Sequence, residues 1–228
     1  MLRNTWWGKT LRFIGILLMG ITALFTIAGG LGTTCVALNP TGFGENMALL
    51  AQFQWLYIVF VIATTAIGIM AARAVFLLAK SRPNSYRYAI IALVLGSIVG
   101  TIHMLVSRSL RGKSMPVDGV VYTTVLTLIV FLLFRIPKIW QGVGYTSGNS
   151  DDKTGKMAAA ITLLATGILT LTVQYWAGPT HIWGGTNWAA TFLITSTMLG
   201  ISQLIAGVVL LWTPAKARLT VSRPIVQN

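Results

Sequence analysis

Long apolar blocks alternate with short polar segments along the whole chain. A helix needs about 20 apolar residues to cross the ~30 Å hydrocarbon core of a bilayer. Six blocks of roughly that length lie at about 11–31, 54–79, 88–107, 119–136, 157–177 and 188–212. The pattern therefore predicts an all-α, polytopic membrane helical bundle of about six transmembrane helices, in which residues 1–228 form a single integral membrane domain.

The polar segments predict where the helices end. Lys80 to Ser85 reads as a tight turn in which Asn84 or Ser85 is available to cap the third helix. Pro137 predicts the end of the fourth span, because proline lacks the amide hydrogen that a helix interior needs. Residues 142–156 are rich in Gly, Ser, Asn and Asp and predict a flexible cytoplasmic linker.

The composition favours a membrane protein over a nucleic-acid-binding one. Apolar residues make up 55% of the chain and charged residues 9%, whereas soluble domains carry about 25% charged residues. The net charge of +13 is gathered in short clusters between the apolar blocks, where anionic lipids would meet it. We therefore expect the lipid bilayer, and no nucleic acid, as a partner. Cys35 is the only cysteine, so an internal disulfide is excluded.

Lysine and arginine predict the orientation, because they accumulate in cytoplasmic loops. With both termini in the cytoplasm, 14 of the 17 basic residues fall on the cytoplasmic side, and the loops 32–53 and 178–187 contain none. The apolar run from Phe13 to Ala28 follows three basic residues, as in a secretory signal, but no convincing cleavage site follows and we interpret it as a span. The expected location is the plasma (inner) membrane, which the chain crosses several times.

The tryptophans divide evenly between the two expected membrane surfaces, where their amphipathic rings are favoured. The inner group is Trp6, Trp7, Trp140 and Trp212, and the outer group is Trp55, Trp176, Trp183 and Trp188. This division supports the topology predicted from charge.

One loop departs from the charge rule. Arg108, Arg111 and Lys113 fall on the outer side, between the third and fourth spans. One explanation is that the three charges are tolerated and pair with Asp118 and Glu45. The alternative is a basic site for an anionic group or for an acidic surface of a partner.

His103 is the ionisable residue placed deepest in a span. It lies 15 residues after Tyr88, about 22 Å along the helix, in the outer third of the membrane. Ionisable groups at such depth are costly and often functional. One explanation is a neutral imidazole that is hydrogen-bonded inside the bundle. The alternatives are a ligand of haem or of a chlorophyll-type pigment, or a quinone contact, although His181 lies in a loop and is a poor second haem ligand.

Small and hydroxylated residues predict helix contacts. Gly96-x-x-x-Gly100 precedes His103, and such a pair lets another helix approach closely. Thr162, Thr166 and Thr170 form a stripe along the fifth span. Such hydroxyls usually bond to their own helix or to the next one.

The unusual polar residues fall in or near the outer third of the predicted bundle. The candidate ligand- or partner-binding site comprises His103, Arg108, Arg111, Lys113, Asp118, Tyr122, Glu45, Gln174 and His181. With four carboxylates, two histidines and one cysteine, no catalytic residue and no metal site is predicted. We therefore expect a protein that is not an enzyme.

Three functions are compatible with these features. The first is a non-catalytic helical subunit or scaffold of a larger membrane assembly, whose outward-facing basic loop docks other membrane protein subunits. The second is a membrane protein that binds or transports a small solute or a lipid. The third is a redox or photosynthetic membrane subunit that uses His103 as a macrocycle ligand or quinone contact.

Overall fold

The computed structural model describes residues 5–145, 152–176, 178, 182–183 and 185–213. In chain order the elements are α1 (Trp6–Leu38), η2 (Pro40–Phe43), α2 (Glu45–Ala48), η3 (Ala51–Phe53), α3 (Gln54–Ala79), α4 (Ser85–Arg111), α5 (Val117–Leu133), α6 (Pro137–Val143), α7 (Asp152–Leu171), α8 (Val173–Trp176), β1 (Ile182–Trp183), β2 (Thr186–Asn187), α9 (Trp188–Thr191) and α10 (Leu193–Trp212). Among the described residues the only strands are β1 and β2, which pair antiparallel with Ile182 opposite Asn187. The predicted all-α class is confirmed.

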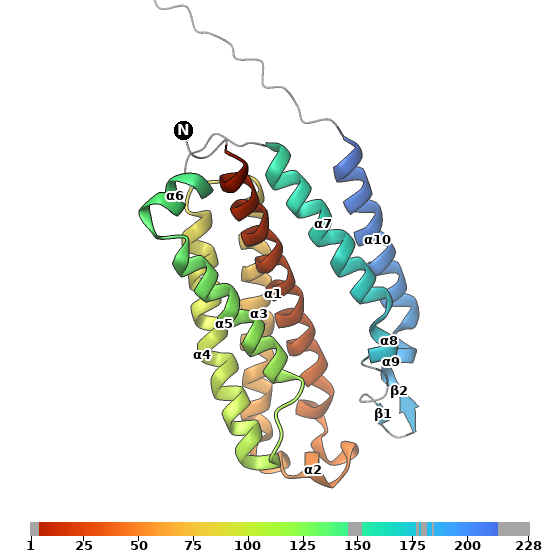
Figure 1. The fold of residues 1–228 in the computed structure, drawn as a ribbon. Helices are drawn as coiled ribbons and strands as arrows, with labels where there is room; N and C mark the ends of the chain where they lie inside the picture. Colours follow the sequence, from red (N-terminus) through yellow and green to blue (C-terminus); the bar gives the residue numbers. More distant parts are fainter. Residues whose placement is uncertain (1–4, 146–151, 177, 179–181, 184, 214–228) are drawn as a thin grey trace, which may run out of the picture.

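The helices cross a membrane about six times. In the part of the chain that the structure describes, five helices are long and apolar enough to span it alone, namely α1, α3, α4, α7 and α10. The 17 residues of α5 extend about 26 Å, and α5 qualifies only together with α6. However, α4 ends at one end of the bundle and α7 begins at the other, so α5 has to run between them (Figure 1). The protein is thus a multi-pass membrane protein.

The two ends of the bundle differ in what they hold. We call the end where α1 begins and α10 ends the N-terminal end (Figure 1). The opposite end, which includes Leu38, Gln54, Arg111 and Val117, is the distal end. Because α1 begins and α10 ends at the same end (Figure 1), the described helices traverse the bundle an even number of times.

Four helices, α1, α3, α4 and α5, form the main bundle, and α1 contacts α3, α5, α6 and α7. A glycine in α1 explains its close approach to α3: a Cβ on Gly30 would lie 2.5 Å from the hydroxyl of Thr65. α1 continues through Gly29 and Gly30 to Leu38, although glycine is unfavourable inside a helix. Close packing on α3 and α5 offsets the low helix propensity of glycine.

The Gly96-x-x-x-Gly100 pair lets α4 pack against α5, as predicted. A Cβ on Gly96 would lie 3.2 Å from Thr124, and one on Gly100 would lie 2.9 Å from Val121. Both contacts involve branched side chains of α5. The pair therefore presses the part of α4 before His103 onto its neighbour.

The helices α7 and α10 form a hairpin that leans on the bundle at the N-terminal end and diverges from it toward the distal end (Figure 1). Glycines hold the hairpin together, since a Cβ on Gly200 would lie 2.6 Å from Leu171. On the bundle side, a Cβ on Gly155 would lie 2.0 Å from the carbonyl oxygen of Ala79. The hydroxyl of Thr162 bonds back to its own helix, at the carbonyl of Ala158, over 2.8 Å, as predicted.

The chain turns sharply after α5. α6 is bent by 102° from α5 and starts with Pro137, whose fixed φ suits the first turn of a helix. Its far end packs on α1, where a Cβ on Gly142 would lie 3.6 Å from the Cα of Gly8. The short helix therefore crosses the N-terminal end of the bundle rather than continuing the span.

The structure shortens the predicted linker at 142–156 at both ends. Gly142, Val143 and Tyr145 are buried, and α7 already begins at Asp152. Residues 146–151 lie outside the described part of the chain. The prediction rested on the small polar residues of this stretch and overlooked Tyr145. The aromatic ring of Tyr145 packs into the bundle and holds the first part of the segment against it.

Among the described residues, the buried apolar side chains form two clusters. The larger one lies toward the N-terminal end of the bundle and includes Ile16, Met19, Leu78, Phe131 and Tyr145. The smaller one, at the distal end, consists of Ala37, Leu50, Tyr57 and Phe60. The fold is therefore packed most extensively at the N-terminal end.

Candidate functional site

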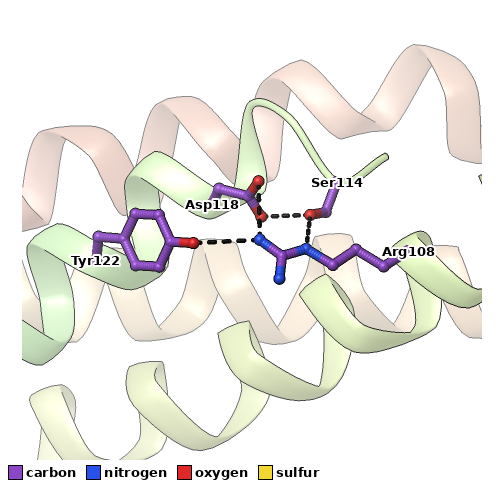
Figure 2. Close-up of polar contacts among 4 residues, drawn as sticks. All are labelled: Arg108, Ser114, Asp118 and Tyr122. Atoms are coloured by element: carbon purple, nitrogen blue, oxygen red, sulfur yellow. Dashed lines mark hydrogen bonds and ion pairs between the residues drawn. The ribbon is translucent and has the colours of Figure 1, made fainter. Parts of the chain in front are cut away.

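Arg108 is the centre of a polar network at the distal end (Figure 2). Its Nε donates a hydrogen bond to the hydroxyl of Ser114 over 2.8 Å, and its Nη2 donates one to the hydroxyl of Tyr122 over 3.1 Å. Nη2 also lies 3.3 Å from the carboxylate of Asp118, which accepts a hydrogen bond from Ser114. The expected pairing with Asp118 is present, and it neutralises the charge of Arg108 within the chain.

The turn between α4 and α5 assembles this network. Gly112 ends α4 with a φ of +68°, and its amide donates to the carbonyl of Arg108 over 2.8 Å. Glycine takes up this left-handed conformation without the strain that a side chain would cause. After the turn, Asp118 lies in the first turn of α5 and Tyr122 one turn later, so both project from the same face. Ser114 is buried between the guanidinium and the carboxylate.

Arg111 and Lys113 have different surroundings from Arg108. Nη1 of Arg111 contacts the sulfur of Met47 at 3.1 Å, and a thioether is a weak acceptor. The Nε of Arg111 is buried without a hydrogen-bond acceptor among the described residues. Lys113 and Glu45 are exposed. In the part of the chain that the structure describes, no carboxylate pairs with Arg111 or Lys113.

His103 lies inside the bundle, one to two turns of α4 before the arginines. Its side chain is 5% exposed. The ring stacks on Phe60 with 4.4 Å between centroids, and it is nearly perpendicular to the ring of Tyr57 with 5.3 Å between centroids. The hydroxyl of Tyr57 shares a 2.8 Å hydrogen bond with Ser107. The predicted burial of His103 is confirmed, while the predicted hydrogen bond of its imidazole stays a prediction.

A small cavity adjoins His103 where α1, α3, α4 and α5 meet. Its volume is about 20 Å³, and Thr26, Thr64 and Thr124 contribute to its wall. Such a volume accommodates about one water molecule, whereas pockets for small-molecule ligands measure roughly 300–1,000 Å³. The haem, chlorophyll-type pigment or quinone considered from the sequence therefore has no room in this cavity.

The remaining predicted site residues do not join the network. Gln174 lies in α8, on the hairpin side of the molecule, and is half-buried. His181 lies outside the described residues. The structure thus brings together Arg108, Asp118 and Tyr122, and keeps His103 apart from them in an aromatic environment.

Several residues of this region were missed from the sequence. Ser114 had one available signal, since it precedes Asp118 by four residues and hydroxyls often bond to a side chain one turn later. Met47 and Phe60 had none, because both are brought to α4 from other helices. Their positions depend on helix packing, which a local pattern does not describe.

The N-terminal end contains two buried polar side chains, Arg12 and Tyr145, that the sequence analysis did not single out. Arg12, one of the basic residues near the start of the chain, is 1% exposed. The hydroxyl of Tyr145 donates a hydrogen bond to the carbonyl of Arg12 over 3.3 Å. Burial raises the pKa of the Tyr145 phenol well above its ordinary value, so this group is protonated at neutral pH.

Comparisons with known proteins do not assign the chain to a family. No family model, curated protein or solved structure matches it. Within the described residues, no group of three or more His, Cys, Asp or Glu side chains could hold a metal ion. The functional interpretation therefore rests on the geometry of the two ends of the bundle.

Proposed function

We propose that this multi-pass membrane protein is a non-catalytic subunit of a larger membrane assembly, and that its distal end docks an acidic surface of a partner subunit. The observation that carries the proposal is the uneven use of the three basic side chains at that end. Arg108 is neutralised by Asp118. Arg111 and Lys113 pair with no carboxylate in the described part of the chain.

Arg111 is suited to such a contact because part of its guanidinium is already desolvated. Its Nε is buried, and Nη1 is directed at the sulfur of Met47. A carboxylate would be a stronger acceptor than a thioether and could bind the guanidinium through two parallel hydrogen bonds. Exposed Lys113, two residues later, would add a second positive charge to the same contact.

The alternatives receive less support from the geometry. A pigment-binding or quinone-binding role at His103 would need far more space than the cavity of about 20 Å³ beside it. A solute-binding role would likewise need a pocket of roughly 300–1,000 Å³. The exposed apolar side chains of the spans, such as Ile194 and Met198 on α10, are accounted for by contact with lipid.

The proposal includes an orientation with the distal end outside, which follows from the charge asymmetry. Single cysteines at Thr41 and Lys80, both exposed and at opposite ends, test it in a Cys35→Ser background. We expect a membrane-impermeant maleimide to label Thr41→Cys in intact cells and Lys80→Cys only after permeabilisation. The opposite labelling pattern would show that the distal end faces the cytoplasm.

The docking itself is tested with a double variant, Arg111→Gln with Lys113→Gln. The matched control is Arg82→Gln with Arg87→Gln, which removes two exposed charges at the N-terminal end. Each protein is extracted gently from its own membrane, and the chains that accompany it are quantified by mass spectrometry. The extraction is repeated in 1 M salt, where the screening length falls to about 3 Å.

We expect the wild type and the control to retain the same partner chain at low salt. The distal double variant should lose that chain, and the wild type should lose it in 1 M salt, because rim charges act through screened electrostatics. Undiminished retention by the double variant would exclude the docking role. A large fall in thermal stability of the double variant would instead identify the two residues as structural.

A further inference from the structure

Arg135 lies at the N-terminal end, in the bend between α5 and α6, and contacts two aromatic rings. Its Cζ is 5.1 Å from the ring centroid of Trp140 and 5.7 Å from that of Tyr86. The two rings meet edge to face with 4.7 Å between centroids. Guanidinium groups are attracted to aromatic faces at such distances. The side chain of Arg135 is exposed, so the contact orients a charge that solvent or lipid can reach.

The aromatic platform is itself held in place. The hydroxyl of Tyr86 donates a 2.7 Å hydrogen bond to the carbonyl of Phe131, and the two rings stack with 5.9 Å between centroids. Tyr86 is buried. The position of Arg135 is therefore set by a rigid part of the core rather than by a flexible surface segment.

The hydrogen-bonding groups of Arg135 remain available, in contrast to those of Arg108. In the described part of the chain its side chain has no carboxylate or hydroxyl partner. The contacts with the two rings do not pair the N–H groups of the guanidinium with an acceptor, and its planar fork of donors matches two oxygens of a phosphate. A preorganised arginine with unused donors is the arrangement expected of an anion-binding side chain.

The surroundings indicate which anion reaches it. α6 is bent by 102° from α5 and packs on α1 across the end of the bundle. Exposed Lys138 lies on α6, and the exposed tryptophans at the start of α1 and the end of α10 belong to the same end. Tryptophan and basic side chains at the ends of spans mark the level of the lipid headgroups.

We propose that Arg135, held on Trp140 and Tyr86, binds the phosphate of an anionic phospholipid at the N-terminal end of the bundle. Lys138 supplies a second positive charge to the headgroup. The site is at the opposite end from the docking surface, so neither proposal depends on the other.

The test measures lipid retention by native mass spectrometry. The protein is purified in detergent with phosphatidylglycerol or with phosphatidylcholine at equal concentration, and the bound lipid is counted. The variants are Arg135→Gln and Arg135→Lys, with Arg82→Gln as the matched control that removes one exposed charge at the same end. A further arm adds inorganic phosphate to the phosphatidylglycerol sample.

We expect the wild type and Arg82→Gln to retain phosphatidylglycerol in preference to phosphatidylcholine. Retention by Arg135→Gln should fall on the order of tenfold, since charged hydrogen bonds are lost. Arg135→Lys should lose most of the retention, because an ammonium group has no flat face or fork. The melting temperature of Arg135→Lys in phosphatidylcholine should equal that of the wild type, which would show that the fold is intact.

Three outcomes would overturn the proposal. Equal losses in Arg135→Gln and Arg82→Gln, or full retention by Arg135→Lys, would show diffuse attraction to the basic end rather than a site. Displacement of the lipid by inorganic phosphate at equal concentration would assign the site to free phosphate. Equal retention of the two lipids by the wild type would show that the anionic headgroup is not recognised.

Discussion

The two ends of the bundle place particular tyrosine, glycine and arginine residues in contrasting surroundings. At the N-terminal end, Tyr145 is fully buried and Gly155 has the backbone of α3 against it. At the distal end, Tyr122 is 59% exposed and Gly119 has no heavy atom within 4 Å of the place where a Cβ would stand. These two tyrosines and two glycines thus serve packing at the N-terminal end and a polar surface at the distal end.

Arg108 and Arg135 show the opposite contrast, since the arginine donors are used at the distal end and remain available at the N-terminal end. Arg108 at the distal end uses its donors on a serine, an aspartate and a tyrosine of its own chain. Arg135 at the N-terminal end contacts rings and keeps its donors available. Burial of apolar groups and satisfaction of charges are therefore separate properties, and mutations at the two ends should separate stability from binding.

The largest effect is expected from emptying the site of Tyr145. Tyr145→Ala should lower the free energy of unfolding by about 3–5 kcal/mol, the usual cost of truncating a buried aromatic ring. Tyr122→Ala, at the distal end, should cost about 1 kcal/mol or less, because an exposed ring leaves no cavity. Equilibrium unfolding in mixed detergent and SDS micelles compares the two. Similar losses would contradict the contrast between the ends.

The next effect comes from adding one methyl group at either end. Gly155→Ala would place its Cβ 2.0 Å from the carbonyl oxygen of Ala79, which forces α7 away from α3 and should cost about 1–3 kcal/mol. Gly119→Ala meets open space and should leave stability unchanged or raise it by up to about 1 kcal/mol, because alanine favours helix. A stable Gly155→Ala protein would mean that α7 is free to shift.

A smaller effect is expected from the ion pair of Arg108. Asp118→Asn removes the negative charge of the network and should change the melting temperature by about 2 °C or less, because exposed pairs contribute little. It also frees a third positive charge at the distal end. Under the docking proposal, the partner chain should then persist at a higher salt concentration than with the wild type. Loss of the partner would show that Asp118 itself contacts it.

The smallest effect appears only at alkaline pH. The pKa of Tyr145 is raised in the folded protein, so its neutral form stabilises the fold below the ordinary tyrosine pKa of about 10. This contribution is lost as the pH rises above that value, because the unfolded chain then releases the proton and the folded chain keeps it. The melting temperature of Tyr145→Phe should fall less than that of the wild type between pH 8 and about pH 11.

The spans could be predicted because lipid imposes a simple requirement. A run of about 20 apolar residues satisfies its backbone only as a helix in hydrocarbon, and for Gln54–Ala79 the predicted and observed limits coincide. The observed ends of other helices differ from the predicted ends because packing competes with local sequence signals. α1 runs through two glycines, and Tyr145 orders the start of a segment whose composition predicts a linker.

The candidate site was only partly predictable. The spacing of Arg108 and Asp118 across one short loop made their pairing foreseeable, and the depth of His103 in its span indicated burial. The contacts of Arg111 with Met47, of His103 with Phe60 and of Arg135 with Tyr86 join different helices. The local pattern of one helix does not indicate which side chain of another helix these residues contact.

The sequence by itself determined that this protein is a bundle of about six membrane helices with basic residues concentrated at one end, because hydropathy and charge act residue by residue along the chain. Only the tertiary structure decided which charges are neutralised and which remain available. For Arg111 and Arg135 that distinction depends on contacts with Met47 and Tyr86, which lie tens of positions away in the chain. Such distances are set by the small side chains that let particular helices approach one another.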